Sequence, residues 1–202
     1  MLIIHGRSGG LVPPELIELA GELEHHRGAP VILETLTATE PPPIPEPGAA
    51  LTTLVPLFLL PGGHVRRDLP LRVARWRASG PVRRLPFLGA WPAWQAALVE
   101  EVQRLPLPTN AATPLLVHHP VEGFLPQRYL AHLASLCGAR SLAVSSPAWE
   151  GSEAGPCPRE PALPLAMASC RLTDGLGAWL GPPLLARPHC RQALLDLLVA
   201  LA

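Results

Sequence analysis

The chain has 202 residues, of which 48% are hydrophobic and 16% charged, and its formal net charge is zero. A chain of this length buries enough surface to form one large or two small hydrophobic cores. Without an excess of basic residues it offers no face for a polyanion, so we expect no nucleic-acid partner. No apolar run approaches the roughly 20 residues that cross a bilayer, so we expect no membrane partner.

The amino terminus, MLIIHG, has no basic segment and no long apolar run before a cleavage site. It therefore does not have the pattern of a signal peptide, and we expect a cytoplasmic protein. No cysteine pair has a CxxC or other zinc-site spacing, which in the cytoplasm favours reduced thiols that pack in the interior. The cysteines all lie in the second half, at Cys137, Cys157, Cys170 and Cys190.

Strands and helices are expected to alternate through the first half. The strands are predicted at 2–4, 31–36, 54–60 and 82–88, and the helices at 13–28, 69–78 and 91–105. A proline-rich run, PPPIPEP, follows the second strand and cannot donate backbone hydrogen bonds, so we expect an extended connection there. A short helix is expected near 49–53. This order predicts an α/β unit with a mostly parallel sheet.

The same pattern begins again after a short linker that contains proline. Helices are expected at 125–137, 173–180 and 191–201, and strands at 115–118, 141–145, 163–168 and near 184. We interpret the chain as a tandem duplication, with one unit at 1–106 and the other at 113–202. Six residues of the second half match six of the first at a constant offset: Leu115, Leu116, Val117, His118, Gly123 and Pro126 follow Leu2, Ile3, Ile4, His5, Gly10 and Pro13.

The stretch PLFLLPGGHVRRDLP, at 56–70, has the pattern of a buried strand that ends in a site. Gly62 and Gly63 would allow positive φ and a close approach to a ligand, because no Cβ forbids it. His64 would stand at the carboxyl end of the third strand, where parallel α/β sheets bind ligands. His5 follows the first strand in the same way, within HGRSGG.

The second half lacks the groups that make this stretch distinctive. It has HHPVEG in place of HGRSGG, and AMASCRLTDGLG in place of the glycine pair and histidine. We therefore expect the first unit to carry the chemistry and the second to retain the architecture. His118 and His119 are interpreted as relics of the duplication.

These motifs resemble the sirohydrochlorin chelatases of the CbiX and SirB type, which are class II tetrapyrrole chelatases. The resemblance covers residues 2–104 and is carried by LIIHG, VILETL and PLFLLPGGHVRRDLP. It implies two tandem chelatase-like α/β units that face each other across a cleft. It also implies insertion of a divalent metal, Co²⁺ or Fe²⁺, into sirohydrochlorin in cobalamin or siroheme biosynthesis. No cofactor beyond that metal is implied.

The resemblance also assigns roles to individual residues. His5 and His64 would present the metal, and Glu34 would be an acidic helper. This chain has HGRS where the family commonly has HGSR, which leaves His5 in register. The residue types fit independently, because neutral imidazole can bind a divalent metal or accept a proton near neutral pH. The carboxylates of the substrate would be bound by charged and backbone donors of Arg7, Arg66, Arg67, Gly62 and Gly63.

Several alternatives stay open on the sequence alone. Glu34 lies on a buried type of strand, where an unpaired carboxylate is costly, so it is either functional or salt-bridged. Asp68 is interpreted as a helix cap in preference to a catalytic base. A protein that only carries metal or tetrapyrrole would keep the same histidines, whereas a hydrolase that uses Ser8 lacks a nucleophile elbow. Imidazole suits cobalt and iron equally, and we expect a monomer or a weak dimer.

Overall fold

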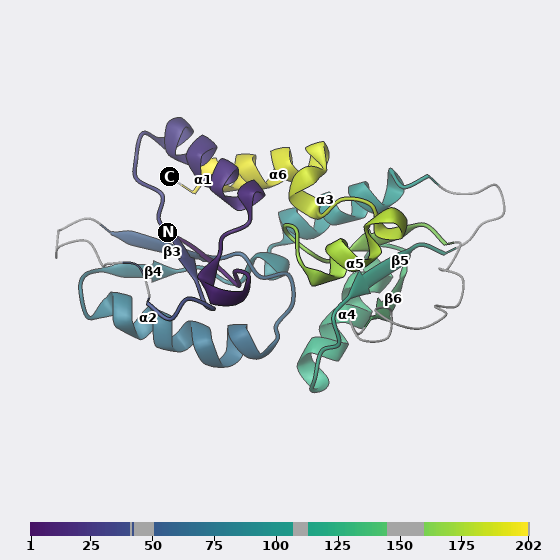
Figure 1. Ribbon diagram of the computed structural model, residues 1–202, viewed down its shortest axis with the longest axis horizontal. Helices are drawn as coiled ribbons and strands as arrows, with labels where there is room; N and C mark the ends of the chain where they lie inside the picture. The colour runs from purple at the N-terminus through teal and green to yellow at the C-terminus, as the bar shows by residue number, and fades with distance from the viewer. Residues whose placement is uncertain (41, 43–50, 107–112, 145–159, 202) are drawn as a thin grey trace. The chain divides into compact units, whose positions relative to one another are not determined.

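The computed structural model describes residues 1–40, 42, 51–106, 113–144 and 160–201, which form two compact units (Figure 1). The first unit comprises Met1–Pro92 with Leu195–Ala202, and the second comprises Ala93–Leu194. Strands and helices alternate in both units, so the predicted α/β class is confirmed. None of the helices in the described ranges is long and apolar enough to cross a membrane.

The first unit contains a four-stranded parallel sheet in the order β2-β1-β3-β4. The predicted parallel arrangement is therefore correct for this unit. Its elements in chain order are β1 (Leu2–Ile4), η1 (Ser8–Gly10), α1 (Pro14–Arg27), β2 (Leu33–Thr35), β3 (Thr52–Pro56), η2 (His64–Asp68), α2 (Leu69–Arg77), β4 (Val82–Arg84) and η3 (Leu88–Ala90).

Helix α1 shows how proline and glycine set the ends of an element. Pro14 lies in its first turn, where a missing N–H costs nothing, and Gly28 ends it in the left-handed conformation with φ of 59°. The Gly28 N–H donates to the Glu24 carbonyl and satisfies one of the last acceptors of the helix. Both ends lie where the sequence predicted them.

Several strands are shorter than predicted, and the described end of one predicted helix lies in a strand. β3 ends at Pro56, whereas the prediction extended it to 60. It begins at Thr52, which pairs with Val82 of β4, so the helix expected near 49–53 is wrong at its described end. Leu57 and Leu59 are buried although they lie outside the strand, which explains the long apolar run. The proline-rich run at 41–47 lies outside the described residues apart from 42.

Positive φ falls on other glycines than the sequence predicted. Neither Gly62 nor Gly63 has positive φ, and Gly63 is right-handed helical, with φ of −56° and ψ of −41°. The reason is that the helical backbone begins before the predicted start at 69. The Arg66 N–H already donates to the Gly62 carbonyl, at 3.3 Å. The tight turn lies instead directly after β1, where Gly6 has φ of +79°.

A buried ion pair joins the sheet of this unit to α2. Glu34 of β2 is 0% exposed, and its Oε2 accepts a hydrogen bond from Trp76 Nε1 at 2.6 Å. Its Oε1 lies 3.4 Å from Arg72 Nε and 3.7 Å from Arg75 Nη1. Of the two alternatives for Glu34, the structure shows the salt-bridged one. The surrounding apolar core packs α2 on the sheet through Ile3, Leu54, Phe58, Leu69, Val73 and Trp76.

The second unit contains a three-stranded parallel sheet in the order β6-β5-β7. Helix α3, which closes the first sequence repeat, belongs with this unit, and the chain after Leu194 belongs with the first. The elements of this part of the chain are α3 (Pro92–Gln103), β5 (Leu115–His118), α4 (Phe124–Leu136), β6 (Arg140–Ala143), β7 (Ala162–Pro164), α5 (Arg171–Leu180) and η5 (Leu184–Ala186). Helix α6 (Pro188–Val199) is divided, because its residues up to Leu194 belong with this unit and those from Leu195 belong with the first.

The strand predicted near Leu184 is wrong, because this segment is the 3₁₀ turn η5. The Arg187 N–H donates to the Leu184 carbonyl at 3.1 Å and closes the turn. The first unit has the same turn at η3, where the Trp91 N–H donates to the Leu88 carbonyl at 2.9 Å. Each turn is followed by a helix that begins with proline, in LGAWP and LLARP. This shared local structure supports a tandem duplication.

Replacing Glu34 with alanine should lower the free energy of unfolding by about 2–4 kcal/mol, because it leaves the Trp76 N–H without an acceptor and two arginines without their buried counter-charge. Glu34→Gln should lose less, since its amide oxygen can still accept from Trp76. Urea denaturation measures both. The control is Glu100→Ala, which removes a half-exposed partner of Arg104 and His189 and should cost about 1 kcal/mol or less. Equal losses at Glu34 and Glu100 would contradict the buried ion pair.

Gly6→Ala should destabilise the turn after β1, because a Cβ at Gly6 would lie 2.6 Å from Thr37 Oγ1 and 2.8 Å from Thr35 Cβ. With the strain of positive φ added, we expect a loss of about 1–3 kcal/mol, measured by thermal unfolding. The matched control is Gly62→Ala, where an added Cβ meets no atom within 4 Å. A neutral Gly6→Ala, or a Gly62→Ala that is equally harmful, would refute this assignment of the turn.

Candidate functional site

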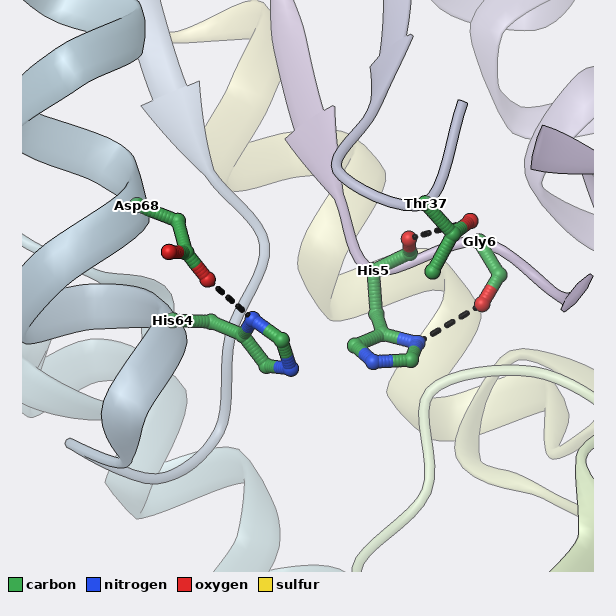
Figure 2. A network of polar contacts seen from close by, with 5 residues as sticks. All are labelled: His5, Gly6, Thr37, His64 and Asp68. Atoms are coloured by element: carbon green, nitrogen blue, oxygen red, sulfur yellow. Dashed lines mark hydrogen bonds and ion pairs between the residues drawn. The ribbon is translucent and has the colours of Figure 1, made fainter. Parts of the chain in front are cut away.

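His5 is the first residue after β1, and the loop that follows β2 holds its backbone in place (Figure 2). The single O–H of the Thr37 side chain is shared between two carbonyl acceptors, Arg7 at 2.7 Å and His5 at 3.1 Å from Oγ1. The Thr37 N–H also donates to the His5 carbonyl, at 3.2 Å. These contacts hold the backbone at the carboxyl end of β1, while the His5 side chain remains exposed.

The ring of His5 makes one short hydrogen bond with the next residue. Its Nδ1 lies 2.7 Å from the Gly6 carbonyl oxygen (Figure 2). A carbonyl can only accept, so Nδ1 must be the protonated, donating nitrogen. In the neutral ring this leaves Nε2 with an available lone pair.

His64 begins the π-helical turn η2, which continues directly into α2. Its Nδ1 lies 2.6 Å from Asp68 Oδ2, and the two side chains are 45% and 46% exposed. The predicted role of Asp68 as a helix cap is wrong. Its own backbone is helical, with φ of −79° and ψ of −40°, and its side chain makes no capping hydrogen bond. The helical backbone has already begun at His64, so no cap is needed at Asp68.

The structure brings the two predicted histidines together. The ring centroids of His5 and His64 lie 4.5 Å apart, with an angle of 70° between the ring planes. Phe58 stacks on the His64 ring, with centroids 6.4 Å apart and an angle of 23° between planes. Figure 2 shows the imidazoles approaching each other from two chain segments. The site is therefore a pair of imidazoles at the carboxyl edge of a parallel sheet.

The predicted arginines are exposed and lie next to the histidines in the chain. Arg66 and Arg67 belong to the same turn as His64, and Arg7 follows His5 by two residues. The Arg67 guanidinium lies over Gly63, because a Cβ added at Gly63 would be 2.8 Å from Arg67 Nη2. The open face of Gly63 is thus covered by a side chain of its own helix.

Glu34 is placed differently from the histidines. Its carboxylate is fully buried, and its contacts are with Trp76, Arg72 and Arg75 of α2. Its effect on the histidines is therefore indirect, since α2 follows η2. No three or more His, Cys, Asp or Glu side chains are grouped to hold a metal ion within the described ranges. The donors that the histidine pair offers are its two Nε2 atoms.

The second unit keeps half of this arrangement. His118 ends β5, and its Nδ1 lies 2.7 Å from the His119 carbonyl oxygen, as His5 does with Gly6. The His118 side chain is only 4% exposed, and burial is the main cause that lowers its pKa, which favours the neutral ring. No imidazole corresponding to His64 is present, because the segment before α5 reads AMASC.

Cys170, the residue before α5, is a thiol that interacts with His119. Burial raises its pKa, but hydrogen bonds from His119 and from the backbone at Thr173 and Leu172 outweigh it, so the pKa is lowered overall. Burial raises the pKa of Cys137 to about 11 and that of Cys190 to about 12. These three cysteines are reduced, as predicted, and Cys157 lies outside the described residues.

Sequence reasoning missed two residues of the site. The partnership of Asp68 with His64 could have been found from their spacing, because residues four apart share a helix face. Thr37 gave no such signal, since its position depends on the pairing of β1 with β2.

Comparisons with known proteins agree with this fold. The solved structure of CbiX, the terminal enzyme for biosynthesis of siroheme in denitrifying bacteria, is 23% identical with a TM-score of 0.61, over 100% of this chain and 97% of that chain. SirB from Bacillus subtilis with Fe³⁺ is 16% identical with a TM-score of 0.66, over 96% of this chain and 92% of that one. These likenesses show a shared fold.

The comparison by sequence is more specific for the first unit. No curated protein matches the chain. The family model CbiX matches residues 1–105, which include both histidines and their partners Gly6 and Asp68. Since this match covers more than half of the chain, the chain belongs to the CbiX family.

Proposed function

We propose that this protein is a chelatase that inserts a divalent metal ion, Co²⁺ or Fe²⁺, into sirohydrochlorin in cobalamin or siroheme biosynthesis. The observation that carries the proposal is the contact between His5 and His64, whose ring centroids lie 4.5 Å apart. Membership of the CbiX family supports it, because the sequence motifs of the first unit resemble those of sirohydrochlorin chelatases.

Metal insertion requires a site that holds a divalent ion and then releases it. Two neutral imidazoles meet this requirement, because they bind borderline divalent metals without the tight hold of a thiolate cage. His5 and His64 both have Nδ1 engaged in a hydrogen bond, so each can offer Nε2 to the ion. The macrocycle presents four ring nitrogens, so transfer of the metal ion to these four donors is favoured over its retention by the two imidazole nitrogens.

The reaction also releases two protons from pyrrole N–H groups for each ion inserted. An imidazole that has given up the metal regains a free Nε2 lone pair, and it can accept such a proton near neutral pH. The same two side chains can therefore serve both steps. The overall reaction consumes the divalent ion and the free macrocycle and yields the metallated macrocycle and two protons, so it needs no cofactor beyond the metal.

Sirohydrochlorin carries many carboxylates, which suit the exposed arginines next to the site. Arg66 and Arg67 share the turn of His64, and Arg7 follows His5, so charge-assisted hydrogen bonds from these side chains would orient the ring. The predicted backbone donor at Gly62 is already engaged, because its N–H donates to the Leu60 carbonyl at 2.9 Å, so the weaker backbone donor would be the N–H of Gly63. In this scheme Glu34 acts at a distance, by fixing α2 on the sheet.

The test follows the absorbance change of sirohydrochlorin on mixing with the purified full chain and Co²⁺ or Fe²⁺, against the uncatalysed rate. His64→Ala should lower the initial rate by about 100-fold or more, the usual contribution of a residue that transfers protons. His118→Ala should retain most of the rate, because that ring is buried and the segment before α5 has no histidine in the place of His64. The ratio of the Co²⁺ and Fe²⁺ rates identifies the preferred metal.

Each other outcome excludes part of the proposal. No acceleration with either metal by the wild-type protein would refute the chelatase, and binding of metal or tetrapyrrole without acceleration would favour a carrier. Equal losses in His64→Ala and His118→Ala would refute the assignment to the first unit. Circular dichroism of each variant checks that the fold is intact.

A further inference from the structure

We infer that Asp68 is a positioning residue, which fixes the tautomer of His64 and makes the two imidazoles of the pair unequal as metal donors. The tautomer follows from geometry alone, whereas its consequence for metal transfer rests on the proposed function. Asp68 touches His64, and it acts through that ring (Figure 2).

The proton of the neutral His64 ring lies on Nδ1. Its Nδ1 lies 2.6 Å from Asp68 Oδ2, and an ionised carboxylate only accepts hydrogen bonds. Nδ1 must therefore carry the proton, and in the neutral ring Nε2 keeps its lone pair. An unconstrained neutral imidazole in water favours the opposite tautomer, with the proton on Nε2. Asp68 thus selects the form that can bind a metal through Nε2.

A π-helical turn of the backbone places Asp68 relative to His64. The Leu69 N–H donates to the His64 carbonyl, five residues back, which defines a π-helical turn. Single π turns within α-helices are rare and occur frequently at functional sites. Here the turn extends from His64 to Asp68, so the two interacting side chains lie at its two ends. The local helix geometry therefore holds the carboxylate beside the ring.

Asp68 has neither of the other roles that its position in the chain would allow. It does not cap α2, because its backbone is helical and its side chain bonds no N–H of the helix. Three arginines, Arg66, Arg67 and Arg72, lie close in the chain. Within the described parts of the chain, however, the ion pair of this carboxylate is with His64. Asp68 is thus neither a cap nor a partner of these arginines, and His64 is its partner.

The imidazoles of His5, His64 and His118 differ in the charge of the group that accepts from Nδ1. His5 and His118 each hydrogen-bond through Nδ1 to a backbone carbonyl, which is neutral. His64 bonds to a carboxylate, which carries a negative charge. A carboxylate behind an imidazole makes it a stronger electron donor and fixes its orientation. His64 is therefore the stronger donor of the pair, and a shared ion would leave His5 first.

The test observes the tautomer directly in the metal-free full chain. Long-range ¹H–¹⁵N correlation spectra above neutral pH should show protonated Nδ1 and unprotonated Nε2 for His64 in the wild type. Asp68→Ala should shift His64 toward the Nε2–H form and leave His5 unchanged. Asp68→Asn keeps the shape of the side chain without its charge, so it is the variant to use if Asp68→Ala perturbs the helix. Its His64 should shift toward the Nε2–H form less than in Asp68→Ala. Asp174→Ala, on α5 of the second unit, is the control and should change neither ring.

A second measurement follows Co²⁺ binding by its visible absorption. Asp68→Ala should weaken the affinity about 10–100-fold, the usual effect of losing a partner behind a ligating histidine. A His64 tautomer that is the same in Asp68→Ala and the wild type would overturn the inference. A changed tautomer with unchanged Co²⁺ affinity would overturn the positioning role. A wild-type protein that shows the predicted tautomer and Co²⁺ binding, but no metal insertion, would refute the proposed function and support this inference.

Discussion

The site depends on the parallel pairing of β1 with β3, in which Leu2 lies opposite Val55 and Ile3 opposite Pro56. Parallel pairing brings the carboxyl ends of both strands to the same edge of the sheet. His5 follows β1 directly, and His64 follows β3 after a short buried segment, so two residues that are distant in sequence meet there. An antiparallel arrangement of the same strands would place these imidazoles at opposite edges.

Most of the fold could be predicted because local sequence determines its main elements. The β-branched run of β1 and the proline and glycine that bound α1 identify their elements directly. β1 and β5 have the predicted bounds, but the other strand lengths could not be predicted, since a strand ends where its neighbour stops pairing, as β3 does at Pro56. The early start of the helical backbone before α2 also had no local signal. It removed both the positive φ expected at Gly62 and Gly63 and the expected cap at Asp68.

The same limits apply to the site. The sequence identified both histidines from their place at strand ends, and the structure brings them into contact. It could not give the nature of their partners, because Thr37 reaches the His5 carbonyl from the loop after β2 and Asp68 reaches His64 within a π turn. Glu34 had two open interpretations from sequence, and only the packing of α2 on the sheet could show that its carboxylate is an ion-pair partner.

The two units show that this architecture and the site chemistry are separable. Both units retain a parallel sheet and a histidine at the end of the first strand with the same Nδ1 contact. In the first unit this histidine is in contact with a second imidazole, His64, which has a carboxylate partner in Asp68. X-ray absorption spectroscopy of the full chain with one equivalent of Co²⁺ tests the pair most directly: we expect two imidazole ligands, reduced to one in His5→Ala and in His64→Ala. Two imidazole ligands in both variants, or none in the wild type, would contradict a shared metal site.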